Sequence, residues 1–90
     1  MAAVRIPPTL RAEVGGLREL EAGGDTVAAV LDDLVERYPL LGEQLLAGGE
    51  LASYVNVYLG GEDIRTLDGL ETPVHDGETL ILLPAMAGGV

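Results

Sequence analysis

The residues with the clearest chemical use stand at the carboxyl end, where Gly88 and Gly89 precede Val90. A glycine pair cannot pack a core, because glycine loses more backbone entropy on ordering than any other residue and offers no side chain in return. Such a segment is either idle or the working part of the molecule. A terminal carboxylate is ionised at neutral pH and is a poor electrophile, so chemistry through it requires prior activation.

The other titratable residues form no comparable constellation. The one histidine, His75, stands beside the turn signal Asp76-Gly77 and is expected in a surface loop. Adjacent acidic residues such as Asp32 and Asp33 do not converge on one site in a helix. Cysteine is absent, which argues against a disulfide framework or a thiolate metal site. We therefore expect no catalytic residues, no metal site and no bound cofactor.

Composition indicates one small acidic domain. The chain has 90 residues and a formal net charge of −10 at pH 7. This charge would repel nucleic acid and anionic lipid and attract a basic protein surface, although solubility alone also explains it. No apolar run approaches the ~20 residues of a membrane span, and the N-terminus does not resemble a secretion signal. We expect a cytoplasmic protein that binds neither nucleic acid nor membrane.

The absence of lysine has two compatible explanations. All 5 basic residues are arginine, as a GC-rich genome would favour. Chemistry offers a second explanation. A protein whose own carboxyl end becomes an acylating agent benefits from having no amine or thiol of its own to acylate.

The elements that would position this end begin with two strands. A first strand near Val4 would end at Pro7-Pro8, because proline cannot donate a ladder hydrogen bond. Gly15-Gly16 is a turn signal, and residues 17–22 would form the return strand. The two segments together predict an N-terminal hairpin.

A helix is predicted next, with an apolar face formed by residues at helical spacing: Val27, Val30, Leu31, Leu34, Val35 and Tyr38. Either Asp25 or Thr26 would cap its first turn, since both side chains offer an oxygen to the free N–H groups. Pro39 would end it. A short helical turn is expected over residues 40–46.

Three strands are predicted in the rest of the chain. Residues 54–59 alternate with a period of two, and Gly60-Gly61 would turn the chain into a short partner strand over residues 62–65. The last strand, residues 78–83, would end at Pro84. Its apolar run predicts a central strand with Leu80 and Leu82 facing the helix. The outward residues would form a docking patch beside the root of the tail: Tyr58, Ile81 and Leu83.

This order of elements predicts an α+β fold in which one main helix covers one face of a mixed sheet. Five stretches carry a resemblance to a known family: Ile6-Pro7-Pro8-Thr9-Leu10-Arg11, Gly24-Asp25-Thr26-Val27, Tyr54-Val55-Asn56-Val57-Tyr58, Glu62-Asp63-Ile64-Arg65 and Leu82-Leu83-Pro84-Ala85-Met86-Ala87-Gly88-Gly89. In this order, they resemble the ubiquitin-like β-grasp fold and, within it, the ThiS/MoaD family of sulfur carriers. The resemblance implies a sheet of four to five strands in a domain spanning residues 1–84, followed by a flexible Gly-Gly tail over residues 85–90.

The same resemblance implies a carrier protein and not an enzyme. In this family a separate E1-like adenylating and sulfurtransferase enzyme uses ATP to activate the terminal glycine, which becomes a thiocarboxylate that donates sulfur. By this resemblance Gly89 would carry the sulfur. The thin segment that threads into partner enzymes would consist of Ala85, Met86, Ala87 and Gly88.

Within the family, the chain is most similar to carriers of an actinobacterial cysteine pathway. That similarity implies a PLP-dependent cysteine synthase-like acceptor and a JAMM-type zinc metallopeptidase. The peptidase would cut after Gly89 and remove Val90, unless Val90 is foreign to the natural protein. Other sulfur acceptors remain open, namely molybdopterin, thiamin or a thio-modified natural product. Two further alternatives are a ubiquitin-like modifier joined to lysines of target proteins and an interaction module with an inert tail.

Overall fold

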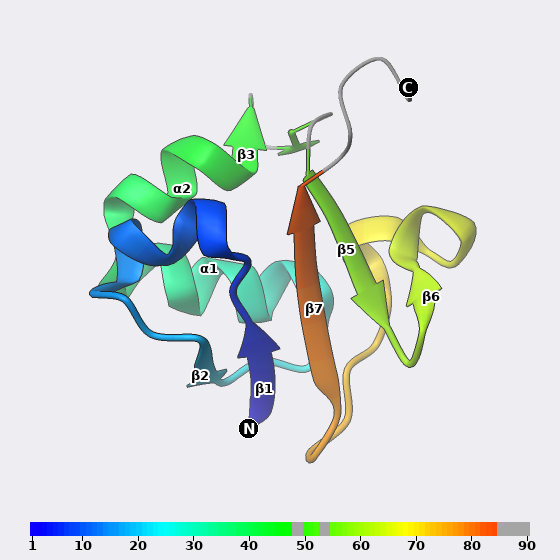
Figure 1. Cartoon of the computed structure of the whole chain (residues 1–90). Coiled ribbons are helices and arrows are strands. Elements are labelled where there is room, and N and C mark those ends of the chain that lie inside the picture. The colour runs from blue at the N-terminus through cyan, green and yellow to red at the C-terminus, as the bar shows by residue number, and fades with distance from the viewer. Residues whose placement is uncertain (48–49, 53–54, 85–90) are drawn as a thin grey trace.

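The computed structural model describes residues 1–47, 50–52 and 55–84 of the chain. A mixed five-stranded sheet runs in the order β2-β1-β7-β5-β6 (Figure 1). Its strands are β1 (Ala2–Arg5), β2 (Glu19–Ala22), β5 (Val55–Leu59), β6 (Glu62–Asp63) and β7 (Thr79–Pro84). β1 and β7 are parallel, and the other neighbouring strands are antiparallel. The predicted mixed sheet of four to five strands is confirmed, with five.

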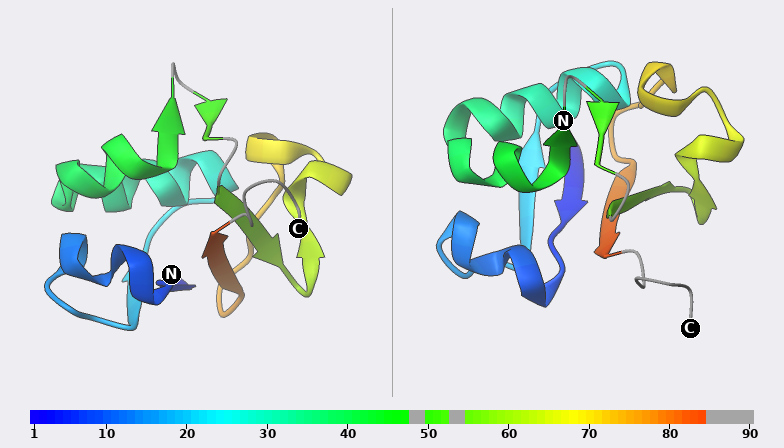
Figure 2. Two further views of the ribbon diagram at one scale, coloured as in Figure 1. Left: turned by 45° about the horizontal axis from the view of Figure 1, so that its top comes forward. Right: turned by 90° about the horizontal axis from the view of Figure 1, so that it is seen from above.

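Two helices cover one face of the sheet, and Figure 2 shows both on the same side of it. They are α1 (Val27–Arg37) and α2 (Pro39–Leu45). Both agree with the predicted main helix and the short helical turn. Within the described ranges, neither helix combines the length and apolar content needed to cross a membrane.

Local chemistry explains where α1 begins and how closely α2 packs on it. The Ala29 N–H donates to Thr26 Oγ1 at 3.2 Å, so Thr26 is the side chain that caps the helix. Gly42 in α2 is buried, and a Cβ there would lie 2.6 Å from Val35 Cγ1 of α1. The two helices therefore approach each other at a position that only glycine fits without movement of Val35.

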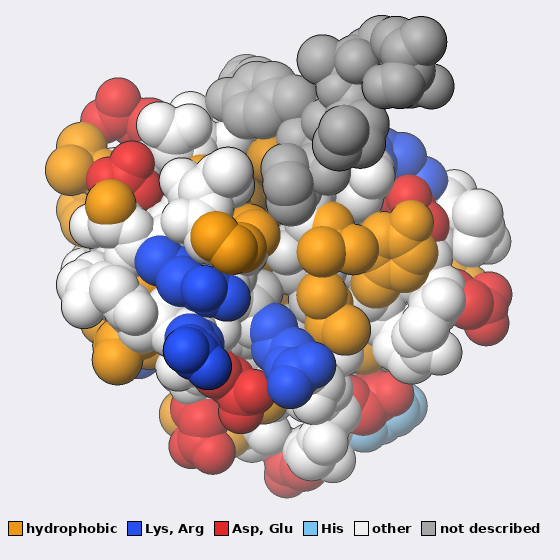
Figure 3. Space-filling view, in the orientation of Figure 1, with side chains coloured by type: hydrophobic (Ala, Val, Ile, Leu, Met, Phe, Trp, Pro, Cys, Tyr) orange, Lys and Arg blue, Asp and Glu red, His pale blue; other side chains and the backbone are white. Residues whose placement is uncertain are grey.

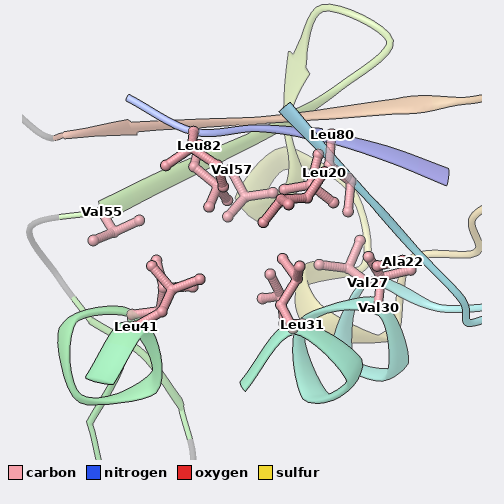
Figure 4. Close-up of a cluster of buried hydrophobic side chains, with 14 of the residues drawn as sticks. Leu20, Ala22, Val27, Val30, Leu31, Leu41, Val55, Val57, Leu80 and Leu82 are labelled. Carbon is pink, nitrogen blue, oxygen red and sulfur yellow. The ribbon is translucent and has the colours of Figure 1, made fainter. Parts of the chain in front are cut away.

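The core lies between the sheet and the helices, where strand side chains point toward helix side chains (Figure 4). All the members that the figure labels are at most 8% exposed: Leu20, Ala22, Val27, Val30, Leu31, Leu41, Val55, Val57, Leu80 and Leu82. Within the predicted helix face, Val35 and Tyr38 are only half-buried. The apolar residues that recur every 3.6 positions in the helices therefore pack against those that recur every two positions in the strands, and together they form one apolar layer.

β7 is the central strand of the sheet, as its apolar run predicts. Leu80 and Leu82 are 0% and 1% exposed and belong to the core, whereas Leu83 is 42% exposed. Ile81 is half-buried. Because side chains alternate along a strand, Ile81 and Leu83 share the face of the sheet opposite to the helices.

The connection between β1 and β2 differs from the predicted hairpin. The two strands do pair antiparallel, but a 3-10 helix, η1 (Pro8–Val14), lies between them. Pro7 and Pro8 end the strand as predicted, and Leu10 and Val14 then become buried four residues apart. A tight turn at Gly15-Gly16 would leave both of these side chains in solvent, so burial explains the helix.

The second half of the chain departs from prediction in two places. The predicted strand over residues 62–65 pairs only as Glu62–Asp63, because the Arg65 N–H donates to Asp63 Oδ1 at 2.9 Å and the chain enters η2 (Ile64–Thr66). η3 (Gly69–Glu71) follows in the predicted linking loop. A small two-stranded sheet of β3 (Leu46–Ala47) and β4 (Glu50–Leu51) was not predicted.

Substitutions of Leu82 and Leu83, adjacent on β7, test the two faces of the sheet. Leu82→Ala removes a fully buried side chain and should lower the free energy of unfolding by about 2–5 kcal/mol. Leu83→Ala removes a side chain on the outer face and should cost less than about 1 kcal/mol. Urea denaturation of both variants measures the difference. Equal losses would contradict the assignment of the two faces.

Candidate functional site

The sheet face opposite the helices carries an apolar surface at the carboxyl end of β7. Tyr58 of β5 lies directly opposite Ile81 of β7, and Asn56 lies opposite Leu83. We call Tyr58, Ile81 and Leu83 the outer patch. The structure brings these three predicted residues onto one face, because alternate positions on paired antiparallel strands become neighbours. Figure 3 shows apolar side chains on this face.

The predicted tail residues, Ala85, Met86, Ala87, Gly88, Gly89 and Val90, lie outside the described residues. The described chain ends at Pro84, whose backbone pairs with Val55 of β5. Leu83 of the outer patch is therefore only one residue before this strand end.

A groove of about 470 Å³ adjoins the outer patch on the β1 side. It shares Ile81 and Leu83 with the patch, and its lining is Arg5, Ile6, Pro7, Pro8, Arg11, Arg18, Glu19, Ile81, Leu82 and Leu83. We call it the arginine groove. Three of the chain's 5 basic residues line it, against one acidic residue. Figure 3 shows arginine side chains gathered beside the apolar surface.

The three arginines differ in how they are held. Arg11 Nε donates to the Ile6 carbonyl oxygen at 3.0 Å, which fixes its side chain against the residue that follows β1. Arg5 Nε lies 3.5 Å from Glu19 Oε1 in a pair whose side chains are both more than half exposed. Within residues 1–47, 50–52 and 55–84, Arg11 and Arg18 form no salt bridge. The groove thus presents positive charge that the described part of the protein leaves largely unneutralised.

Sequence reasoning missed the arginine groove, although one signal was present. Arg5, Arg11 and Arg18 all fall in the first 18 residues of an acidic chain. The β1–η1–β2 unit then brings them to one side of the sheet. Because separations of six and seven residues fit no single periodicity, the sequence alone does not indicate that the three side chains come together. The path of the chain through the 3-10 helix η1 brings them to one groove.

Arg65 has a structural role at the start of β5, one of the two strands that carry the outer patch. Its guanidinium donates to Asn56 Oδ1 at 2.6 Å, to the Val55 carbonyl at 2.9 Å and to the Ala52 carbonyl at 3.3 Å. These bonds tie η2 to the start of β5, the strand segment that pairs with the end of β7. Arg65 therefore helps to hold the backbone on which the outer patch stands.

The remaining titratable groups lie away from the groove or are exposed. His75 is exposed, and its backbone N–H donates to Glu78 Oε1 at 2.7 Å. The N-terminal ammonium donates to Asp76 Oδ1 at 2.6 Å, and this hydrogen bond and positive charge lower the pKa of the Asp76 carboxyl. Across the described residues, no three His, Cys, Asp or Glu side chains gather as a metal site would require.

Comparison with known proteins gives concordant matches over nearly the whole chain. The ThiS family model matches residues 4–89. The sulfur carrier protein CysO of Mycobacterium tuberculosis is 42% identical over 89 residues, which cover 96% of each chain. The crystal structure of the Amycolatopsis orientalis BexX/CysO complex contains a chain that matches with a TM-score of 0.91 and 42% identity, covering 99% of this chain and 100% of that one. The β-grasp fold is thereby confirmed.

A less similar relative is named for a different role. The small archaeal modifier protein 3 of Haloferax volcanii is 38% identical over 64 residues, which cover 71% of this chain and 70% of that protein.

Substitution of Arg65 tests its structural part. Arg65→Gln removes hydrogen bonds to two backbone carbonyls and should lower the free energy of unfolding by about 1–3 kcal/mol. Arg18→Gln is the matched control with the same change of charge, and it should shift stability by no more than about 0.5 kcal/mol. Thermal or urea unfolding compares the two variants. If both variants were as stable as the native chain, the Arg65 network would not support the sheet.

Proposed function

The chain belongs to the ThiS family of sulfur carriers, and on that premise we propose that it donates sulfur from a thiocarboxylate at Gly89 for cysteine synthesis. The observation that carries the proposal is the family match over residues 4–89, whose last matched position is Gly89. The similarity to CysO over 96% of each chain supports the choice of cysteine as the product. Under this proposal the chain acts in the cytoplasm as a carrier.

The proposed chemistry starts from the carboxylate of Gly89 once Val90 has been removed. The carboxylate attacks the α-phosphate of ATP on an E1-like enzyme, forming an acyl-adenylate and releasing pyrophosphate. A sulfur donor then displaces AMP, which leaves sulfur in place of one carboxyl oxygen. The resulting thiocarboxylate is a nucleophile. Its sulfur forms a bond to the β-carbon of an activated serine derivative held by a PLP-dependent acceptor enzyme, and the activated serine oxygen leaves together with its activating group.

The division of the chain into a domain and a tail supports delivery of that sulfur. We assign residues 1–84 to the β-grasp domain and residues 85–90 to the tail. Gly89 is the fifth residue after Pro84, and an extended chain of five residues spans at most about 17 Å. Ala85, Ala87 and Gly88 keep this segment thin, so it would enter a narrow channel toward a buried nucleotide. Met86 offers one apolar contact to a partner.

The outer patch suits docking of the domain while the tail is engaged. Its residues are apolar, and Leu83 is 42% exposed immediately before the end of the described chain. A partner that covers Tyr58, Ile81 and Leu83 would therefore sit directly over the root of the tail. The BexX/CysO complex of A. orientalis supports the view that proteins like this one act through a partner.

Removal of Val90 requires a further partner. A JAMM-type zinc metallopeptidase that cuts after Gly89 would expose the working carboxylate. After the acyl group has shifted from sulfur to the amine, the same type of enzyme would release cysteine from Gly89. Both cleavages break the peptide bond that follows Gly89.

Conjugation to other proteins is a second candidate function. The similarity to small archaeal modifier protein 3 favours it. The activated Gly89 would then be transferred to lysines of target proteins and form isopeptide bonds. A sulfur carrier for molybdopterin, thiamin or a thio-modified natural product differs from our proposal only in the acceptor enzyme.

Intact-mass spectrometry tests the proposed function. After incubation with the cognate adenylating enzyme, the JAMM-type peptidase, ATP and a sulfur donor, the chain should lose Val90 and exchange one oxygen for sulfur at Gly89. Fragmentation should place the sulfur on the terminal residue. A trimmed chain that never gains sulfur with its cognate activator would overturn the carrier proposal.

Gly89→Ala, made in a chain that lacks Val90, provides the control for that experiment. The added methyl group should impair threading of the tail and reduce sulfur gain, because glycine allows the closest backbone approach. Its unfolding transition should match that of the parent chain. Unfolding of the variant under these conditions would instead show that the tail supports the domain.

A further inference from the structure

The distribution of positive charge is uneven for a chain with a net charge of −10. Arg37 lies on α1 and pairs with Asp33 at 3.4 Å, and Arg65 is committed to Asn56 and two backbone carbonyls. The other three arginines line one groove. Positive charge is therefore concentrated beside the outer patch, with which the groove shares Ile81 and Leu83.

The groove arginines retain donors for an outside ligand. Only the Nε of Arg11 bonds to Ile6, so its two terminal nitrogens stay available for an anion within the described structure. The Arg5–Glu19 pair is exposed and 3.5 Å long, and a pair of this kind contributes little to stability. A carboxylate from outside could replace Glu19 at small cost.

The walls of the groove decide between a small anion and a polypeptide. The apolar part of the lining includes Pro7 and Pro8, which follow β1, and Ile81 and Leu83 of β7. A free phosphate ion would use the arginines and leave these apolar walls exposed. A peptide segment that carries both carboxylates and apolar side chains matches both features, and the planar guanidinium binds a carboxylate through two parallel hydrogen bonds.

We infer that the arginine groove binds an acidic, partly apolar segment of the adenylating partner, and this inference rests on the proposed function. The segment would lie beside β7 and continue onto the outer patch, so that one interface holds Leu83 and the root of the tail. The acidic remainder of the carrier would repel such a segment, which restricts binding to this face. Electrostatic attraction at the groove would also speed association.

Binding of the purified cognate adenylating enzyme, without ATP, tests the inference. The test variant is the double substitution Arg11→Gln/Arg18→Gln, and the control is Arg37→Gln, which removes one charge from the helix layer. Circular dichroism and unfolding curves establish that each variant is folded. Stopped-flow association and calorimetry then give the association rate and Kd at low salt and at 1 M NaCl.

The double variant should bind about tenfold more weakly at low salt, with most of the loss in the association rate. The difference should shrink at 1 M NaCl, where charges are screened within about 3 Å. Arg37→Gln should bind within about twofold of the native chain, as expected of a charge outside the interface.

Two results would overturn the inference without touching the proposed function. One is native-like binding by the double variant at low salt, while the native chain still gains sulfur. The other is saturable binding of inorganic phosphate to the native chain at Arg11 and Arg18, seen by NMR, together with an affinity for the enzyme that the double substitution leaves unchanged. Failure of the native chain to gain sulfur would instead reject the proposed function on which the inference rests.

Discussion

The position of β7 between β1 and β5 is the constraint on which the rest of the structure depends. Its backbone is paired on both edges, in parallel with β1 and antiparallel with β5. Its inner face is fixed by burial of Leu80 and Leu82 against the helix layer. A slip of one residue would move Leu82 to the surface and Leu83 into the core, at a cost of several kcal/mol. Core packing therefore determines where Leu83 and Pro84, the last described residue, are placed.

That constraint gives the two faces of one strand different surroundings. The inner residues bind the sheet to α1 and α2, and the outer residues are the ones that we propose for contact with a partner. The proline pair after β1 and the helix η1 place the arginine groove along the same edge of the outer face. An apolar patch, a set of arginines and the end of the described chain at Pro84 thus meet at one end of the sheet. Under the proposed function, this arrangement presents the carboxyl end of the chain to the adenylating enzyme.

Much of this arrangement could be predicted from local patterns. Thr26, the apolar spacing of α1 and Pro39 define the main helix almost to the residue. The apolar run in β7 predicts that it is a central strand of the sheet. The alternation of side chains along a strand then predicts which of its residues lie on each face. The outer patch follows from the period of two alone.

Long-range convergence could not be predicted. Arg5, Arg11 and Arg18 meet only because Leu10 and Val14 draw η1 onto the core, which turns an expected hairpin into a wider loop. The contacts of Arg65 depend on the turn at Asp63, which stops β6 after two residues. Both features arise where side-chain burial or hydrogen bonding overrides a simple strand pattern.

Methyl NMR of the complex with the cognate adenylating enzyme tests the central claim most directly. The claim is that the outer face at the end of β7 is the surface that meets the partner. Methyl signals of Ile81 and Leu83 should shift or broaden on binding. Those of Leu40, which is 59% exposed on α2, should stay unchanged. Perturbation of Leu40 with no change at Ile81 and Leu83 would place the interface on the helix layer and contradict the account.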